Sequence, residues 1–247
     1  MATRPDSRQA TETLEEIDSL FDKMAQWISE NPWPVLGALG GVLAVAALIG
    51  GVQSLQRSRG DEAATAVAAV QGEYLAAMGA APGSFAVVEP ANPERALQIR
   101  TTYAARFQEA AAAHAGSAAA VAAHLEAADL LFATGEDVAA RESLRAATAG
   151  APPGSDLEAL ARLRLAGALE DAADPAGAAS EYERVGAIED FPEHVRALAD
   201  AARCWLDANN AERALEAFAR IDAADMARVP AYTRSRLREL AARQPAP

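Results

Sequence analysis

Residues 118–147 read AAAVAAHLEAADLLFATGEDVAARESLRAA and contain two helix-forming stretches joined by a turn at Gly135 and Glu136. In the second stretch a small residue is followed by a larger apolar residue four positions later and by a further apolar residue three positions after that. The pattern recurs twice, at intervals of 38 and 36 residues. The aligned residues are Ala140, Leu144 and Ala147; Ala178, Tyr182 and Val185; and Ala214, Phe218 and Ile221. Because small side chains let helices pass closely, the repeat predicts stacked helical hairpins that share one core.

The helix that precedes each aligned stretch repeats as well. Its matching residues are Ala127, Ala128 and Leu131; Leu165, Ala166 and Leu169; and Ala201, Ala202 and Trp205. Turn signals separate the helical stretches near residues 116, 135, 150–155, 174, 191, 209 and 229. Over residues 118–228 the chain resembles a degenerate tetratricopeptide repeat, with Pro152 and Pro192 near the positions where a repeat closes on proline. The sequence also predicts a further divergent hairpin, formed by residues 61–78 and the helix that starts at Pro93.

The composition agrees with an all-helical fold. Alanine contributes 66 of the 247 residues and aromatic residues only 5%, whereas strands favour β-branched and aromatic side chains. The formal net charge of −13 and the lack of a basic cluster argue against nucleic acid as a partner. Cys204 is the single cysteine of the chain, which excludes an internal disulfide and a multi-cysteine metal site.

An apolar segment lies upstream of the repeats. Residues 35–52 read VLGALGGVLAVAALIGGV without a charged side chain, and at about 1.5 Å per residue they span roughly 27 Å, close to the ~30 Å hydrocarbon core of a bilayer. The segment predicts an uncleaved single-pass membrane anchor over residues 32–55. A cleaved signal peptide fits poorly, because the preceding residues are numerous and acidic. The alternative, a buried helix of a soluble core, lacks a second segment apolar enough to enclose it.

Small residues recur along this segment at helical spacing. They are Gly37, Gly40, Gly41, Ala44, Ala47 and Gly51. Such a stripe allows another transmembrane helix to dock, although a chain rich in alanine and glycine also produces it by chance. Arg57 and Arg59 lie closer to the membrane than the upstream bases do, so charge alone leaves the orientation open.

The sequence therefore predicts an all-α protein: a single N-terminal transmembrane helix followed by a tetratricopeptide-like solenoid of helical hairpins. Residues 1–31 form an N-terminal segment that contains a short amphipathic helix over residues 13–30, and residues 32–55 form the anchor. Residues 56–93 form a juxtamembrane helix and a loop, and residues 94–247 form the repeat domain.

This layout is similar to that of the YfgM-type family of ancillary SecYEG translocon subunits. The run FQEAAAAHAGSAAAVAAHLEAADLLFATGEDVAARESLRAA, residues 107–147, looks like the first repeat region of that family. The resemblance implies a bacterial inner-membrane protein with a cytoplasmic N-terminus and periplasmic repeats. It further implies contact with translocon subunits, periplasmic chaperones or exported chains. The alternative is a structural scaffold for another envelope complex, such as one for cell-wall synthesis or division.

The sequence offers no arrangement of residues typical of catalysis, a metal or a cofactor. His114, His124 and His194 are scattered without metal-ligand spacing, and no phosphate loop or nucleophile motif occurs. We therefore expect a protein that is not an enzyme and binds no cofactor. In tetratricopeptide arrays the first helix of each hairpin lines the inner face, which here predicts a partner-binding groove. Its residues are Leu125, Asp129, Phe132, Leu163, Glu170, Asp171, Arg196, Arg203 and Leu206. The alternative is that these residues only pack and solvate the solenoid.

Overall fold

The computed structural model describes residues 58–81, 83 and 89–243, and within them all regular secondary structure is helical. A helix over residues 58–78 comes first. The helices that follow are α3 (Pro93–Ala113), α4 (Ala118–Thr134), α5 (Asp137–Gly150), α6 (Asp156–Asp171), α7 (Pro175–Gly186), α8 (His194–Asp207), α9 (Ala211–Ala219), the short 3-10 helix η1 (Met226–Arg228) and α10 (Ala231–Arg243).

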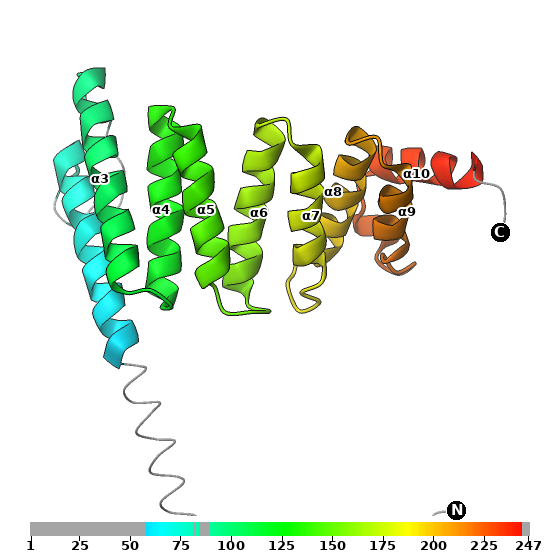
Figure 1. Cartoon of the computed structure of the whole chain (residues 1–247), viewed down its shortest axis with the longest axis horizontal. Coiled ribbons are helices and arrows are strands. Elements are labelled where there is room, and N and C mark those ends of the chain that lie inside the picture. The colour runs from blue at the N-terminus through cyan, green and yellow to red at the C-terminus, as the bar shows by residue number, and fades with distance from the viewer. Residues whose placement is uncertain (1–57, 82, 84–88, 244–247) are drawn as a thin grey trace, which may run out of the picture. The chain divides into compact units, whose positions relative to one another are not determined.

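Consecutive helices from α3 to α9 pack against one another in chain order (Figure 1). The pairs α4–α5, α6–α7 and α8–α9 are the three predicted hairpins, and α10 packs on the last of them. The first helices α4 and α6 of neighbouring hairpins also meet, and α8 contacts α10. This arrangement confirms the predicted tetratricopeptide-like stack of hairpins.

Each hairpin starts and stops where the sequence supplies a cap. The side chain of Ser117 accepts a hydrogen bond from the backbone of Ala120 at the start of α4, and Ser155 does the same for Glu158 at the start of α6. Asp174 caps α7 through the backbone N–H of Gly177. Gly135 ends α4 with a φ of 81°, a left-handed conformation that costs glycine little.

The core confirms the repeat alignment. Ala140, Ala178 and Ala214 are each 0% exposed, and every aligned residue of the first helices is buried. Small residues therefore sit where helices cross, and leucine, tyrosine and tryptophan fill the space between hairpins. Of the aligned set, Phe218 alone is half-buried, packing against the edge of the core.

The predicted divergent hairpin is part of the same core. Tyr74 and Met78, on the helix over residues 58–78, are buried together with Phe107 of α3. Tyr74 and Tyr103 stack with their ring centroids 5.6 Å apart. Arg106 of α3 forms an ion pair with Glu73 and lies over the Tyr103 ring, 5.2 Å from its centroid. These contacts join residues 58–78 to the repeats.

Gly186 permits the close approach of α7 and α8. A Cβ atom at residue 186 would lie 2.5 Å from Cδ2 of Leu198, which is itself buried. Real Cβ atoms do not approach so closely, so the packing of these two helices requires glycine here.

The predicted membrane anchor, its stripe of small residues and the amphipathic helix over residues 13–30 lie outside the described residues. Among the helices that the structure describes, none combines the length and the apolar character that a membrane crossing needs.

Candidate protein-binding face

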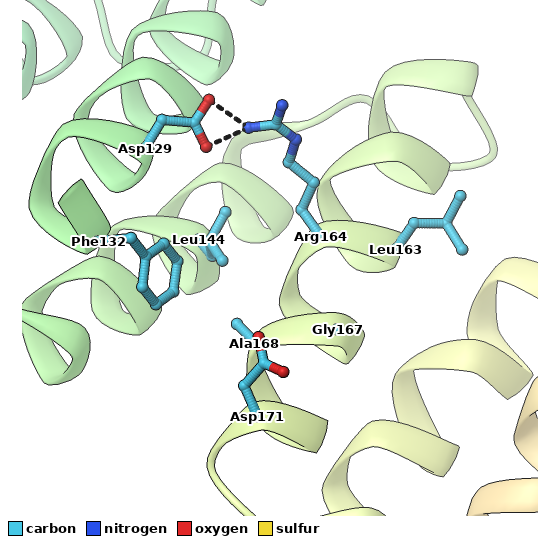
Figure 2. A pocket seen from close by; sticks show the side chains of 8 residues that line it. All are labelled: Asp129, Phe132, Leu144, Leu163, Arg164, Gly167, Ala168 and Asp171. Atoms are coloured by element: carbon cyan, nitrogen blue, oxygen red, sulfur yellow. Dashed lines mark hydrogen bonds and ion pairs between the residues drawn. The ribbon is translucent and has the colours of Figure 1, made fainter.

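We call the surface formed by the first helices α4, α6 and α8 the first-helix face. Between α4 and α6 this face contains a pocket of about 260 Å³, the α4–α6 pocket (Figure 2). The residues that line it are Asp129, Phe132, Leu144, Leu163, Arg164, Gly167, Ala168 and Asp171. Two consecutive repeats, through α4, α5 and α6, therefore build one site.

The inner wall of the pocket is apolar. Leu144 of α5 is 1% exposed and Ala168 of α6 is 6% exposed, so both belong to the core. Phe132 is half-buried and lies beside Leu144 in Figure 2, whereas the side chain of Leu163 is directed away from Phe132. Gly167 contributes no side chain. The pocket therefore offers an apolar wall with one aromatic ring that a ligand can reach.

One end of the pocket is closed by an ion pair between the two helices. Arg164 donates from Nη1 to both carboxylate oxygens of Asp129, at 2.5 and 2.6 Å. The hydrogen bond to Asp129 raises the pKa of Arg164 above its ordinary value. The pair links α4 and α6 at this end of the pocket.

The other end of the pocket is acidic. Asp171 lies there, away from the Asp129–Arg164 pair (Figure 2), and it is exposed and forms no ion pair with any residue that the structure describes. Glu126, one turn before Asp129 on α4, has a pKa raised by partial burial and by the charge of Asp129, against the opposing effect of Arg164. Asp171 thus makes this end of the pocket acidic, and Glu126 adds a further carboxylate near the Asp129–Arg164 pair at the opposite end.

Glu170 and Arg203 form the next connection along the face. Arg203 of α8 places Nη1 2.7 Å from Oε2 of Glu170, and Tyr182 donates its hydroxyl to Oε1 of Glu170 at 2.8 Å. Burial alone would raise the pKa of Glu170, but the hydrogen bonds from Arg203 and Tyr182 outweigh it and lower the pKa. Burial and the bond to Glu170 in turn raise the pKa of Tyr182.

The structure brings four of the predicted groove residues together in the α4–α6 pocket: Asp129, Phe132, Leu163 and Asp171. Glu170 and Arg203 bind each other beside it. Arg196 is exposed, and its Nε lies 3.8 Å from Oδ2 of Asp200. Leu206 packs against the edge of the core. Leu125 is 8% exposed and belongs to the core, so its side chain is covered by its neighbours.

Sequence reasoning missed Arg164, Gly167, Ala168 and Leu144 as lining residues. The repeat register contains the signal for Gly167, because Ala128, Ala166 and Ala202 align and the next residues are Asp129, Gly167 and Arg203. Glycine thus occupies the position at which the neighbouring repeats carry a charged side chain. The repeat pattern places Leu144 in the core, where it does lie, and the gap between α4 and α6 makes it part of the pocket wall.

The side chains of His124 and Cys204, two residue types that often act in catalysis, contribute to packing. Ser143 donates from Oγ to the backbone oxygen of His124 at 3.1 Å, and burial lowers the pKa of His124. Cys204 is 0% exposed, and burial raises its pKa to about 12. Its thiol is therefore protonated at neutral pH and inaccessible to a substrate. Over residues 58–81, 83 and 89–243 no cluster of His, Cys, Asp or Glu has the arrangement of a metal site.

The family comparison agrees with this geometry, since residues 169–237 match the tetratricopeptide repeat family. The chain is also similar to two crystal structures of TPR-like repeats of a Podosopora anserina putative kinesin light chain, one of which carries a point substitution. Each superposes with a TM-score of 0.45 at 15% sequence identity. The match covers 61% of this chain and 84% of the other. No curated protein sequence matches the chain. The family match and the stacked hairpins together make this a tetratricopeptide-like helical repeat protein.

Proposed function

We propose that this protein is a membrane-tethered protein–protein interaction module that binds a segment of a partner polypeptide on its first-helix face. The α4–α6 pocket carries the proposal, because two consecutive repeats combine an apolar wall, a charged rim and a reachable aromatic ring in one place. Such mixed surfaces suit extended or helical segments of other proteins. Tetratricopeptide repeats generally bind other proteins, which supports the same assignment.

The partner that we favour belongs to the protein-export machinery. An apolar segment over residues 35–52 is long enough to span a bilayer, and the order of acidic segment, apolar segment and alanine-rich repeats is similar to that of the YfgM-type family. On this proposal the protein sits in a bacterial inner membrane with its N-terminus in the cytoplasm. Its periplasmic repeats contact translocon subunits, chaperones or exported chains. The second candidate, a scaffold for a cell-wall or division complex, uses the same face and differs only in the partner.

A photo-crosslinking amino acid at position 132 tests the binding role in living cells. Phe132 points into the α4–α6 pocket, so a probe there should form adducts with the partner. The matched control is a probe at Ala149, which is exposed on α5. Adducts with translocon subunits, exported chains or chaperones from position 132, and not from 149, support the export role. Adducts with cell-wall enzymes instead favour the scaffold, and equal adducts from both positions contradict a specific binding face.

Membrane tethering and orientation need a separate test. The protein should remain in the membrane after an alkaline carbonate wash, and the double change Leu43→Arg, Val45→Arg should release it, because each charge costs about 2.5–3.5 kcal/mol at the centre of a bilayer. Protease added to spheroplasts should digest the repeats. Repeats that stay protected would overturn the periplasmic placement.

A further inference from the structure

Gly167 is a glycine that the helix itself does not require. It lies inside α6, four residues before the end of that helix, and its φ is not positive. A Cβ atom at this position would meet no heavy atom within 4 Å. Glycine is among the least favourable residues in a helix interior, and at Gly186 it is explained by close packing. At residue 167 the absent side chain instead leaves the α4–α6 pocket open.

The size of the pocket indicates what can enter it. Its volume of about 260 Å³ lies below the ~300–1,000 Å³ that is typical for pockets that enclose a small-molecule ligand. An apolar wall of Phe132, Leu144 and Ala168 favours a hydrocarbon or thioether group over a polar one. A single large apolar side chain of another polypeptide fits both observations.

The charges around the pocket indicate what accompanies that side chain. Among the residues that line the pocket, Asp129 and Asp171 oppose Arg164, and Arg164 is already paired with Asp129. The pocket residues Phe132 and Asp171 also lie in the last turns of α4 and α6, and neither last turn contains a basic residue. The C-terminal end of a helix carries a partial negative charge, so both helix ends add to the attraction for a cation.

We propose that the α4–α6 pocket receives one apolar side chain, of the size of leucine, methionine or phenylalanine, from a partner segment with an arginine or lysine beside it. Gly167 leaves the space for the apolar group, and Asp171 pairs with the cation. The inference rests on the proposed function, since it names the chemical class of the segment that the first-helix face binds. The proposed partner is a polypeptide segment that carries both an apolar and a cationic side chain.

The experiment measures the binding of short fluorescent peptides to the full-length protein in a neutral detergent, by fluorescence anisotropy at physiological ionic strength. Three peptides of equal length carry leucine with arginine, leucine with glutamate, or serine with arginine at the same positions. The leucine–arginine peptide should bind at least about tenfold more tightly than the serine–arginine peptide, since burial of one large apolar side chain supplies that factor or more. It should also bind more tightly than the leucine–glutamate peptide, because Asp171 repels a glutamate side chain. The serine–arginine peptide controls for unspecific attraction to a chain of net charge −13.

Three variants separate the pocket from the rest of the molecule. Gly167→Leu fills the pocket and should weaken binding of the leucine–arginine peptide about tenfold. Gly72→Leu is the matched control, because Gly72 also lies in a helix with open space around a Cβ atom but is remote in sequence and borders no part of the pocket. It should leave the affinity unchanged. Asp171→Asn should weaken binding by a factor of about five or less and reduce its dependence on salt, as expected for an exposed ion pair.

The outcomes distinguish this inference from the proposed function. Preferred binding of the leucine–glutamate peptide, no binding of any peptide, or an affinity that Gly167→Leu does not change would overturn the inference. In cells, adducts from the probe at position 132 should disappear with Gly167→Leu and persist with Gly72→Leu. Adducts that persist in both variants overturn the inference and leave the binding role standing, whereas no adducts in the otherwise unchanged chain overturn the binding role itself. Gly167→Ala, which adds only a methyl group, should weaken peptide binding less than Gly167→Leu and confirms the result should the larger change disturb folding.

Discussion

Arg203 on α8 binds Glu170 on α6 with Nη1 2.7 Å from Oε2, and so joins the first helices of two consecutive hairpins. Arg164 and Asp129 make the equivalent connection between α6 and α4. Further along the stack, Nη1 of Arg236 on α10 lies 3.8 Å from Oδ1 of Asp207 on α8. At each step an acid on one of the helices α4, α6 and α8 faces an arginine on α6, α8 or α10, so charged residues help to connect consecutive repeats.

Loss of the Glu170–Arg203 pair should destabilise the fold measurably. Glu170→Gln should lower the free energy of unfolding by about 1–2 kcal/mol, because Glu170 accepts hydrogen bonds from both Arg203 and Tyr182 and lies largely inside the structure. A double-mutant cycle with Arg203→Met, followed by denaturant unfolding and circular dichroism, should give a coupling near 1 kcal/mol. Arg196→Met is the control, since Arg196 is exposed and its contacts are 3.8 and 3.9 Å long, and it should change stability by less than about 0.5 kcal/mol. A coupling near zero would show that the pair is incidental to stacking.

The fold was predictable from the sequence because small and large apolar residues recur at the same positions of each repeat. Ala140, Ala178 and Ala214 recur at helix crossings, and small residues at a close crossing leave few alternative packings. Turns were predictable for a similar local reason, since Ser117, Ser155 and Asp174 cap the helices that follow them. Hairpin stacking involves neighbours in the chain, so local signals carry most of the architecture.

The site was only partly predictable, because it depends on distances between helices that a sequence pattern does not give. The repeat register identified Asp129 and Phe132 as residues of the first-helix face. It did not show that Arg164 would reach across to Asp129, or that Glu170 and Arg203 would bind each other. A long arginine side chain can meet several acids on a helix surface, and the packing of α4, α6 and α8 decides which of them it meets across the helix interface.

Replacement of either helical glycine by alanine should stabilise the protein. Gly72→Ala and Gly167→Ala each add a methyl group into open space within a helix, which should raise the free energy of unfolding by about 0.5–1 kcal/mol. Thermal or denaturant unfolding of the two variants measures the effect. Gly186→Ala should instead destabilise, because its Cβ atom would overlap Leu198. A destabilised Gly167→Ala would mean that glycine has a packing role at this position.

An enlarged side chain at a helix crossing should disrupt the stack. Ala140 is 0% exposed on α5, and Ala140→Trp should cost at least about 1–3 kcal/mol through overpacking. Ala149→Trp places the same side chain on the exposed side of α5 and should change stability by less than about 0.5 kcal/mol. The melting temperatures of the two variants, measured by circular dichroism, provide the comparison. Equal melting temperatures would contradict the close crossing at Ala140.

Cys204 should be almost unreactive in the folded protein. Burial raises its pKa to about 12, so the thiol is mainly protonated throughout the ordinary pH range. At pH 8 iodoacetamide should therefore alkylate the native protein far more slowly than it alkylates a free thiol, whose pKa is about 8.5. Denaturant should restore ordinary reactivity. Alkylation of the native protein at the rate of a free thiol would indicate that the thiol is solvated.

Two adjacent residues on α4 should separate stability from binding. Leu131 is 5% exposed in the core, whereas Phe132 is half-buried and lines the α4–α6 pocket. Leu131→Ser should lower the free energy of unfolding by about 2–5 kcal/mol, because it leaves a cavity and buries a hydroxyl group. Phe132→Ser should cost less than half as much, since part of the ring already contacts water, yet it should weaken capture of the leucine–arginine peptide about tenfold, as the loss of a central aromatic contact does at other interfaces. Anisotropy titrations and denaturant unfolding of both variants give the two quantities. If Phe132→Ser lowers stability as much as Leu131→Ser and leaves the peptide affinity unchanged, then Phe132 serves the core and the pocket does not bind through it.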